Sequence, residues 1–411
     1  MTTTEPRPYP FSTPERLDPE PLFAELRERQ PLVRVRLPYG EPGWLATRYE
    51  DVKVVLGDPR FSRAAATGRD EPRTRLHQAP PGNIMSLDPP EHSRLRRLVT
   101  KAFTARRVEQ LRPWTRRIAD GLVDAMLAKG SPADLVEDFA LPLPITVICE
   151  LLGVPYEDRV DFRVWSDAFL STTKFTPAEV VEHVGRLREY MAGLVAARRE
   201  APTDDLIGAL VVARDEEDRL SEDELLSLAE GLLVAGHETT ASQIPNFAYV
   251  LLTHPEQWEL LRADPDLVPR AVEELMRFVP LGLGAGIARY ALEDVELGGV
   301  LVRAGEPVLP VLNSANRDGS VYPDPDRLDL RRQGASHVGF GHGPHHCLGA
   351  PLARMELQVA LDVLLRRLPG LRLAEGEDEN GGIGGSGGIG GIEWKDGLAT
   401  RGPARLPVAW D

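Results

Sequence analysis

The apolar positions of this 411-residue chain recur mainly at the spacing of amphipathic helices. Two shorter regions instead alternate around turn residues, a pattern that is typical of strands. One is residues 32–47, which we expect to form a hairpin, and the other is residues 290–311, around Gly298 and Gly299. The pattern therefore predicts a mainly α fold with a small β part. Helical periodicity is clearest in residues 94–127, 177–199, 221–252, 268–278 and 351–368.

Composition narrows the class of protein. The 42% hydrophobic residues are enough for a large core, and the net charge of −15 disfavours nucleic-acid binding. No apolar run approaches the ~20 residues of a membrane span, and the N-terminus has no apolar signal core. We therefore expect a cytoplasmic protein with no membrane anchor.

The chain has two cysteines, Cys149 and Cys347, which supply no disulfide framework and fit a reducing compartment. Cys149 lies in an apolar run with helical patterning, so we expect it to be a buried core residue.

A low-complexity segment, residues 381–391, consists almost entirely of glycine. A phosphate-binding glycine loop would have to follow a strand and open a helix. Here the next residues, 392–394, have the pattern of a strand instead, so we interpret the segment as a flexible linker.

The most informative residue is Cys347, which ends a glycine-rich run just before a helix-patterned stretch. The positive end of a helix and nearby backbone N–H groups favour a thiolate. A single thiolate held in this way suits the proximal ligand of a haem iron. One alternative is a structural cysteine at a helix start. Another is a zinc site with His342, His345 and His346, although the second ligand cluster of such sites is missing from the sequence.

The run resembles the haem-binding loop of the cytochrome P-450 family of haem-thiolate monooxygenases. All fixed positions of the family pattern Phe-Gly-x-Gly-x-His-x-Cys-x-Gly are matched, by Phe340, Gly341, Gly343, His345, Cys347 and Gly349. The resemblance covers roughly residues 10–411 and implies one triangular, haem-enclosing domain spanning residues 1–411. It also implies haem b as cofactor, with Cys347 as the axial ligand of the iron. The glycine-rich segment departs from the family, which usually has a short connection at that point.

A second motif lies in the stretch 221–252, which begins with a capping box at Ser221 and Glu224. Helical spacing places Gly231, Ala235 and Thr239 on one face, with Val234 and Glu238 beside them. Glycine inside a helix costs about 1 kcal/mol relative to alanine. Gly231 and Gly236 therefore call for a reason, which is either close approach of a ligand or tight helix packing.

Residues 235–240 resemble the family motif Ala-Gly-x-Glu/Asp-Thr-Thr, which lies over the distal face of the haem. The resemblance implies that Thr239 hydrogen-bonds bound dioxygen or a water, and that Glu238 relays protons from solvent. Taken alone, these residues would be a core hydroxyl and a solvated helix acid.

Further positions match weaker family patterns. Glu274 and Arg277 lie one turn apart and resemble a structural Glu-x-x-Arg pair that meets an arginine of a Pro-x-Arg segment, here Arg327. The resemblance also implies that the haem propionates are bound by His92, Arg96, Arg289 and His345. Candidate residues for the substrate pocket are Ile84, Met85, Gly231, Val234, Ala235, Ala285, Ile287, Leu398 and Ala399.

Residues 94–117 carry nine arginines and lysines and only one acid, Glu109, in a chain that is acidic overall. This is either a solvated basic face or a docking surface for an acidic electron carrier. We interpret it as the docking surface for a ferredoxin that is served by its own reductase.

The resulting hypothesis is a monooxygenase that hydroxylates or epoxidises an apolar secondary metabolite, such as a macrolide or terpenoid. It would use O₂ and two electrons from ferredoxin. One alternative is a haem-thiolate enzyme that uses peroxide or catalyses an O₂-independent rearrangement. The other is a non-enzymatic haem-binding sensor or carrier. The intact acid–alcohol pair, Glu238 and Thr239, argues against both.

Overall fold

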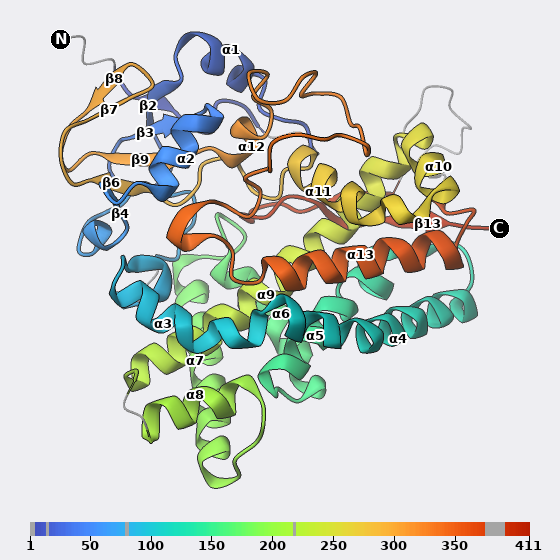
Figure 1. Ribbon diagram of the computed structural model, residues 1–411. Helices are drawn as coiled ribbons and strands as arrows, with labels where there is room; N and C mark the ends of the chain where they lie inside the picture. The colour runs from blue at the N-terminus through green and yellow to red at the C-terminus, as the bar shows by residue number, and fades with distance from the viewer. Residues whose placement is uncertain (1–4, 14–15, 79–81, 217–218, 375–390) are drawn as a thin grey trace.

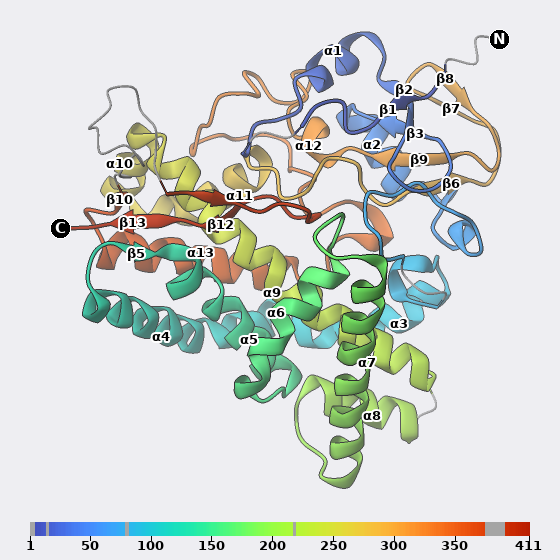
Figure 2. The same ribbon diagram turned by 180° about the vertical axis from the view of Figure 1, so that it is seen from behind.

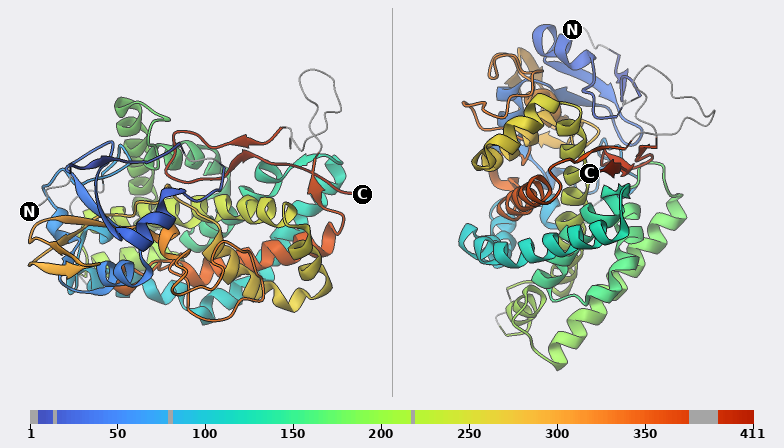
Figure 3. Two further views of the ribbon diagram at one scale, coloured as in Figure 1. Left: turned by 90° about the horizontal axis from the view of Figure 1, so that it is seen from above. Right: turned by 90° about the vertical axis from the view of Figure 1, so that its right-hand side faces the viewer.

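The computed structural model describes residues 5–13, 16–78, 82–216, 219–374 and 391–411. The strands of the main sheet and the β7–β8 ribbon (residues 295–302) gather at one end of the molecule and helices fill most of the rest, which confirms the mainly α prediction (Figure 1). Figure 3 shows the same separation from above, with the blue and orange strands at one side. The outline in Figure 1 is roughly triangular, narrowing toward α8 (Leu206–Asp215). The predicted linker at 381–391 lies outside the described residues except for Gly391.

The main sheet has the strand order β1-β2-β3-β9-β6-β4. The predicted hairpin is present, because β2 and β3 pair antiparallel with Leu32 opposite Ala46. The predicted second β region is also present. Its small ribbon, β7 (Val295–Leu297) and β8 (Val300–Val302), turns at Gly298 and Gly299, which both have positive φ. The strands of the main sheet are β1 (Arg7–Pro8), β2 (Leu32–Arg36), β3 (Gly43–Ala46), β4 (Phe61–Ser62), β6 (Arg289–Ala291) and β9 (Pro307–Pro310).

The C-terminal strands form two smaller sheets near α9. One has the order β10-β13-β5 and the other pairs β11 with β12. Figure 2 shows these strands crossing the molecule above α5 and α13. The strand expected after the glycine-rich segment is β11. The bounds are β5 (Ala133–Asp134), β10 (Arg372–Leu373), β11 (Glu393–Trp394), β12 (Pro403–Arg405) and β13 (Pro407–Ala409).

The five predicted helical stretches are helical, but residues 94–127 are divided. A short 3-10 turn at Lys101–Phe103 separates α3 from α4, and the Thr104 hydroxyl accepts a hydrogen bond from the Arg107 amide. Thr104 has an extended backbone, so it ends the 3-10 turn and its capping begins α4. The longer helices are α3 (Glu91–Thr100), α4 (Ala105–Lys129), α5 (Pro142–Leu152), α6 (Arg159–Phe169), α7 (Pro177–Glu200), α9 (Glu222–Leu252), α10 (Pro255–Ala263), α11 (Val268–Phe278) and α13 (Ala350–Arg367).

The core is organised around α9, which runs through the middle of the molecule (Figure 1). Its predicted capping box is formed by Ser221 and Glu224. Helix α9 packs on α5, α7 and α13, and α13 also lies along α4. Cys149 on α5 is buried in this core, as expected. None of the described helices is both long and apolar enough to cross a membrane. The shorter helices α1 (Leu22–Arg29), α2 (Tyr49–Gly57) and α12 (Leu312–Ala315) cover the main sheet.

Candidate active site

The Cys347 loop is held in a tight path just before α13. The Cys347 amide donates to the Phe340 carbonyl at 2.8 Å, which closes the loop. Gly341 and Gly343 have φ of +75° and +70°, a region that side chains rarely adopt. A Cβ at Gly343 would also clash with the Leu56 carbonyl oxygen at the end of α2. Gly341 and Gly343 are therefore needed for the backbone path.

The Cys347 side chain is exposed at the surface of its loop. Burial raises the pKa of this thiol, while the backbone amides of Gly349 and Ala350 and the Arg96 guanidinium act in the opposite direction. A metal cation bound to the sulfur would deprotonate it outright. The sulfur is thus accessible, surrounded by donors and suited to metal ligation.

A zinc site is not supported. Within the described ranges, no three His, Cys, Asp or Glu side chains are grouped so that they could hold a metal ion. The ring of His345 lies against that of His92 on α3, with centroids 4.2 Å apart. The Cys347 loop therefore presents a single metal ligand, as a haem iron requires.

Buried basic side chains gather beside the loop. Arg289 on β6 is 4% exposed, and its guanidinium donates to the nearby Ile287 carbonyl. Burial, with Arg63 nearby, lowers the pKa of Arg289 to about 9. Burial, with Arg289, also lowers the pKa of His345 to about 3. Both ring nitrogens of His345 and Nδ1 of His92 are buried without a hydrogen-bond partner. Buried polar groups normally have partners. An anion beside these donors, such as a haem propionate, would supply them.

Arg96 binds the backbone of the Cys347 loop. Its guanidinium donates to the carbonyl oxygens of Pro344 at 3.1 Å and His346 at 2.6 Å. It therefore clamps the Cys347 loop onto α3. A guanidinium has five donors, so propionate binding by Arg96 stays a prediction alongside this clamp.

Helix α9 presents one open face in an otherwise buried helix. Ala235 is exposed and Gly231 and Thr239 are partly exposed. A Cβ at Gly231 would meet no atom within 4 Å, whereas one at Gly236 would lie 2.6 Å from Ile148. Of the two reasons considered for glycine, tight packing explains Gly236 and open space explains Gly231. The open stripe of small residues therefore leaves space beside α9 for a cofactor or ligand.

Of the acid–alcohol pair, Thr239 lies on this open face and Glu238 lies in the interior. The Thr239 hydroxyl donates to the Ala235 carbonyl at 2.9 Å, which leaves its oxygen free to accept on the open side. Glu238 is 1% exposed, so it is not a solvated acid. Its Oε1 accepts from Nζ of Lys395 at 2.5 Å, and the hydroxyls of Ser242 and Thr400 lie 3.3 and 3.4 Å from it. The Ser242 hydroxyl also donates to the backbone carbonyl of Glu238 at 2.8 Å. Burial acts to raise the pKa of Glu238, but the Lys395 ammonium and the other neighbouring groups together outweigh this and hold the pKa below its usual range.

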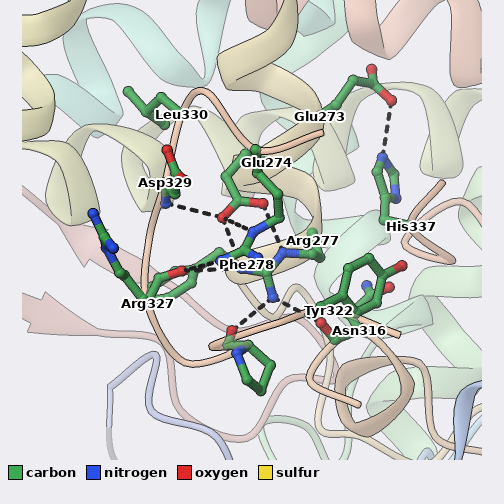
Figure 4. Close-up of polar contacts among 12 residues, drawn as sticks. Glu273, Glu274, Arg277, Phe278, Asn316, Tyr322, Arg327, Asp329, Leu330 and His337 are labelled. Carbon is green, nitrogen blue, oxygen red and sulfur yellow. Dashed lines mark hydrogen bonds and ion pairs between the residues drawn. The ribbon is translucent and has the colours of Figure 1, made fainter. Parts of the chain in front are cut away.

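A buried charge network braces the loop that leads to Cys347 (Figure 4). Arg277 binds both carboxylate oxygens of Glu274 at 2.7 and 2.8 Å, as predicted. The third arginine was predicted wrongly. Arg332, not Arg327, donates to Glu274, at 3.1 Å. Arg327 contributes only its carbonyl oxygen, which accepts from both arginines, and its side chain points away from the pair.

Arg332 and Arg327 should therefore differ in how much their side chains stabilise the fold. Arg332→Ala removes a charge-assisted hydrogen bond from a buried carboxylate and should lower the free energy of unfolding by about 1–3 kcal/mol. Arg327→Ala removes only an exposed side chain and should change it by less than about 0.5 kcal/mol. Urea unfolding of the two variants measures the difference. Equal losses would show that the Arg327 side chain shares the structural role.

A second brace was not predicted from the sequence. Glu273 accepts from Arg354 on α13 at 2.6 Å. It also contacts His337 at 3.2 Å, as Figure 4 shows. The Arg354 guanidinium also lies over the ring of Phe340, 4.5 Å from its centroid. Burial acts to raise the pKa of Glu273, but His337 and Arg354 outweigh it and lower the pKa to about 2. The carboxylate is therefore ionised throughout the physiological range.

The candidate pocket residues come from separate segments, some of which the structure brings together. Gly282 pairs with Thr400, and Leu398 pairs with Ser171. Ile84 and Met85 lie on the short helix η2 (Ile84–Ser86), which packs on α9. Val234 differs from the rest because it is buried in the main core, not on the open face of α9. Whether Ile84, Met85, Ala285, Ile287, Leu398 and Ala399 line one pocket with the open face of α9 stays a prediction.

Comparison with known proteins identifies close relatives. A family model described as cytochrome P-450 matches residues 178–369. Mycinamicin IV hydroxylase/epoxidase of Micromonospora griseorubida is 56% identical, over 100% of both chains. Nocardicin C N-oxygenase of Nocardia uniformis subsp. tsuyamanensis is 54% identical, also over 100% of both. The crystal structure of HinD with NMFT and NO is 52% identical, with a TM-score of 0.94 over 99% of this chain and 100% of that one.

Proposed function

Because this chain belongs to the cytochrome P-450 family and is therefore a haem b monooxygenase, we propose that it hydroxylates or epoxidises an apolar secondary metabolite. Its relatives include a hydroxylase/epoxidase of mycinamicin IV and an N-oxygenase of nocardicin C. A macrolide-sized substrate is our first choice. We also propose that residues 1–411 act as one cytoplasmic domain.

One observation carries the proposal. This chain combines the Cys347 loop with an acid–alcohol pair on α9. The acid, Glu238, is buried, and the alcohol, Thr239, is accessible on the open face of the helix. A sensor or carrier would need the cysteine but no acid–alcohol pair. A peroxide-using enzyme would likewise have no need of a buried proton source.

The residues that would hold haem b offer the chemical groups that it needs, a thiolate for the iron and hydrogen-bond donors for the propionates. Haem b supplies the redox chemistry that activates dioxygen. Cys347 would provide the thiolate, and His92, Arg289 and His345 would donate to the anionic propionates. Arg96 would act mainly through the loop that it clamps. Gly231 and Ala235 would leave room for the cofactor and a substrate at the open face of α9, because neither projects a long side chain.

Thr239 and Glu238 would handle protons. The Thr239 oxygen can hold a water by accepting its hydrogen bond, because the hydroxyl proton is already used by the Ala235 carbonyl. Glu238 would pass protons on through its second oxygen, Oε2, since the donors found all converge on Oε1. Proton transfer by positioned groups contributes about 10²–10⁴-fold to rates.

The electron donor would be a ferredoxin docked on the basic face of α3 and α4. The structure changes which residues we assign to it. Arg112 is paired with Glu109, and Arg116 with Asp362, so both have structural partners. Other cations of residues 94–117 are exposed and form no ion pair with the described residues. They are Arg97, Lys101, Arg106, Arg107 and Arg117.

The double variant Arg106→Glu and Arg107→Glu should therefore slow ferredoxin-driven turnover by on the order of tenfold at low salt. The defect should shrink as ionic strength rises and screening shortens. Peroxide-driven turnover bypasses the partner and should be unchanged. Arg186→Glu, on the exposed face of α7, is the matched charge reversal and should have no effect. Equal losses in both assays would show a structural defect and refute docking at this face.

The proposed substrate class is tested by a binding screen. Macrolides and terpenoids of graded size would be titrated while the haem absorption is followed for a change of spin state. We expect shifts with apolar, macrolide-sized compounds, followed by oxygenated products on mass analysis. A screen in which only small polar compounds bind would overturn the substrate assignment.

A further inference from the structure

The buried ion pair between Glu238 and Lys395 links the proton-handling site to the C-terminal hairpin. Their side chains are 2% and 11% exposed, and Nζ lies 2.5 Å from Oε1. We propose that Lys395 is a positioning residue for oxygenation, which holds Glu238 as a carboxylate with Oε1 fixed and Oε2 left to exchange protons. This inference rests on the proposed role of Glu238 in proton transfer.

The position of Lys395 is set from both sides. Before it, the ring of Trp394 packs edge-on against Tyr249 of α9, with centroids 5.1 Å apart. After it, the Gly397 carbonyl accepts from the backbone amides of residues 172–174, between α6 and α7. Figure 2 shows the tip of this C-terminal segment beside that connection. A long, flexible side chain is thereby presented to α9 from a fixed backbone, as a preorganised site requires.

The side-chain donors around Glu238 all approach one of its two carboxylate oxygens. Lys395, Ser242 and Thr400 all reach Oε1. Lys395 also donates to the Ser242 hydroxyl at 2.9 Å, which joins the donors into one cluster. No described residue hydrogen-bonds Oε2. A cation on one oxygen thus keeps the carboxylate ionised and oriented while the other oxygen stays open.

Other charged groups nearby do not replace Lys395. His237, the preceding residue on α9, is fully buried, and burial lowers its pKa, so it is neutral at pH 7. Lys174 belongs to the α6–α7 connection, but its ammonium pairs with Asp167 at 2.5 Å. Lys395 is therefore the cation that offsets the burial of Glu238.

Infrared spectroscopy gives a readout independent of turnover. Wild-type protein at pH 7 should lack the protonated-carboxyl band of Glu238. Lys395→Met should show this band, and the band should vanish in the Glu238→Gln/Lys395→Met double variant. Lys395→Arg should behave like wild type. Lys174→Met is the matched control and should add no band that depends on Glu238. If Lys395→Met does not fold, Lys395→Gln serves the same comparison, since its amide is neutral.

Turnover then tests the functional part. Product formed per reductant consumed should fall on the order of tenfold in Lys395→Met. In a Glu238→Gln background, the same change should add no further loss. An equal loss in both backgrounds would show a purely structural role, and absence of the carboxyl band would show that Glu238 is ionised without Lys395. Either result overturns the inference. Full product yield in Glu238→Gln alone would instead refute the proposed proton role, while the infrared result would still decide what holds Glu238.

Discussion

Cys347→Ala will abolish thiolate ligation, and with it the strongly red-shifted absorption band of the reduced, CO-bound protein. The physical reason is that the Cys347 loop supplies one sulfur, and the other cysteine, Cys149, is buried in α5, away from this loop. Monooxygenase turnover should fall to background, because the Cys347 thiolate would supply the electron density that favours oxygen activation by a bound haem. Absorption spectroscopy of the reduced protein under CO is the measurement.

The control is Cys149→Ala, which should retain the shifted band and lose only core packing. If the Cys347 variant kept the band, the axial ligand would have to lie elsewhere in the chain. If both variants lost it, the band would report folding and not ligation.

Thr239→Ala will divert reducing equivalents from product into hydrogen peroxide. Its hydroxyl lies on the open face of α9 and donates to the Ala235 carbonyl, which leaves the oxygen free to accept. In the proposed mechanism this oxygen holds the proton-donating water, so the variant would lose that group. We expect product per reductant to fall on the order of tenfold, less than the full effect of acid–base catalysis, because water can occupy part of the space. Reductant consumption should change little. Parallel assays of product, peroxide and reductant measure the partition.

Thr239→Ser is the matched variant because it keeps the hydroxyl. It should restore most of the product yield. Unchanged yield in the alanine variant would contradict the role assigned to Thr239.

The parts of the structure that depend on local signals were predictable. The hairpin of β2 and β3 follows from alternation, and the start of α9 follows from the capping box of Ser221 and Glu224. The Cys347 loop was predictable because its glycines are required by positive φ and close packing. These signals lie within about ten residues of the feature that they determine.

Side-chain contacts between residues that are far apart in the sequence were not predictable. Arg327 and Arg332 both follow the same proline-rich turn, and only the folded path of the chain after it brings the Arg332 side chain to Glu274. Lys395 is 157 residues from Glu238 in sequence and follows a low-complexity segment, so no local pattern pairs them. Arg354 on α13 likewise reaches Glu273 across 81 residues.

The central claim is that this chain inserts one atom of dioxygen into an apolar substrate. The most direct test is turnover of a compound from the binding screen under oxygen-18 gas in ordinary water, with mass analysis of the product. We predict one labelled oxygen atom in the product, and none when the label is supplied in water alone. An unlabelled product under oxygen-18, or turnover that proceeds without dioxygen, would contradict the claim.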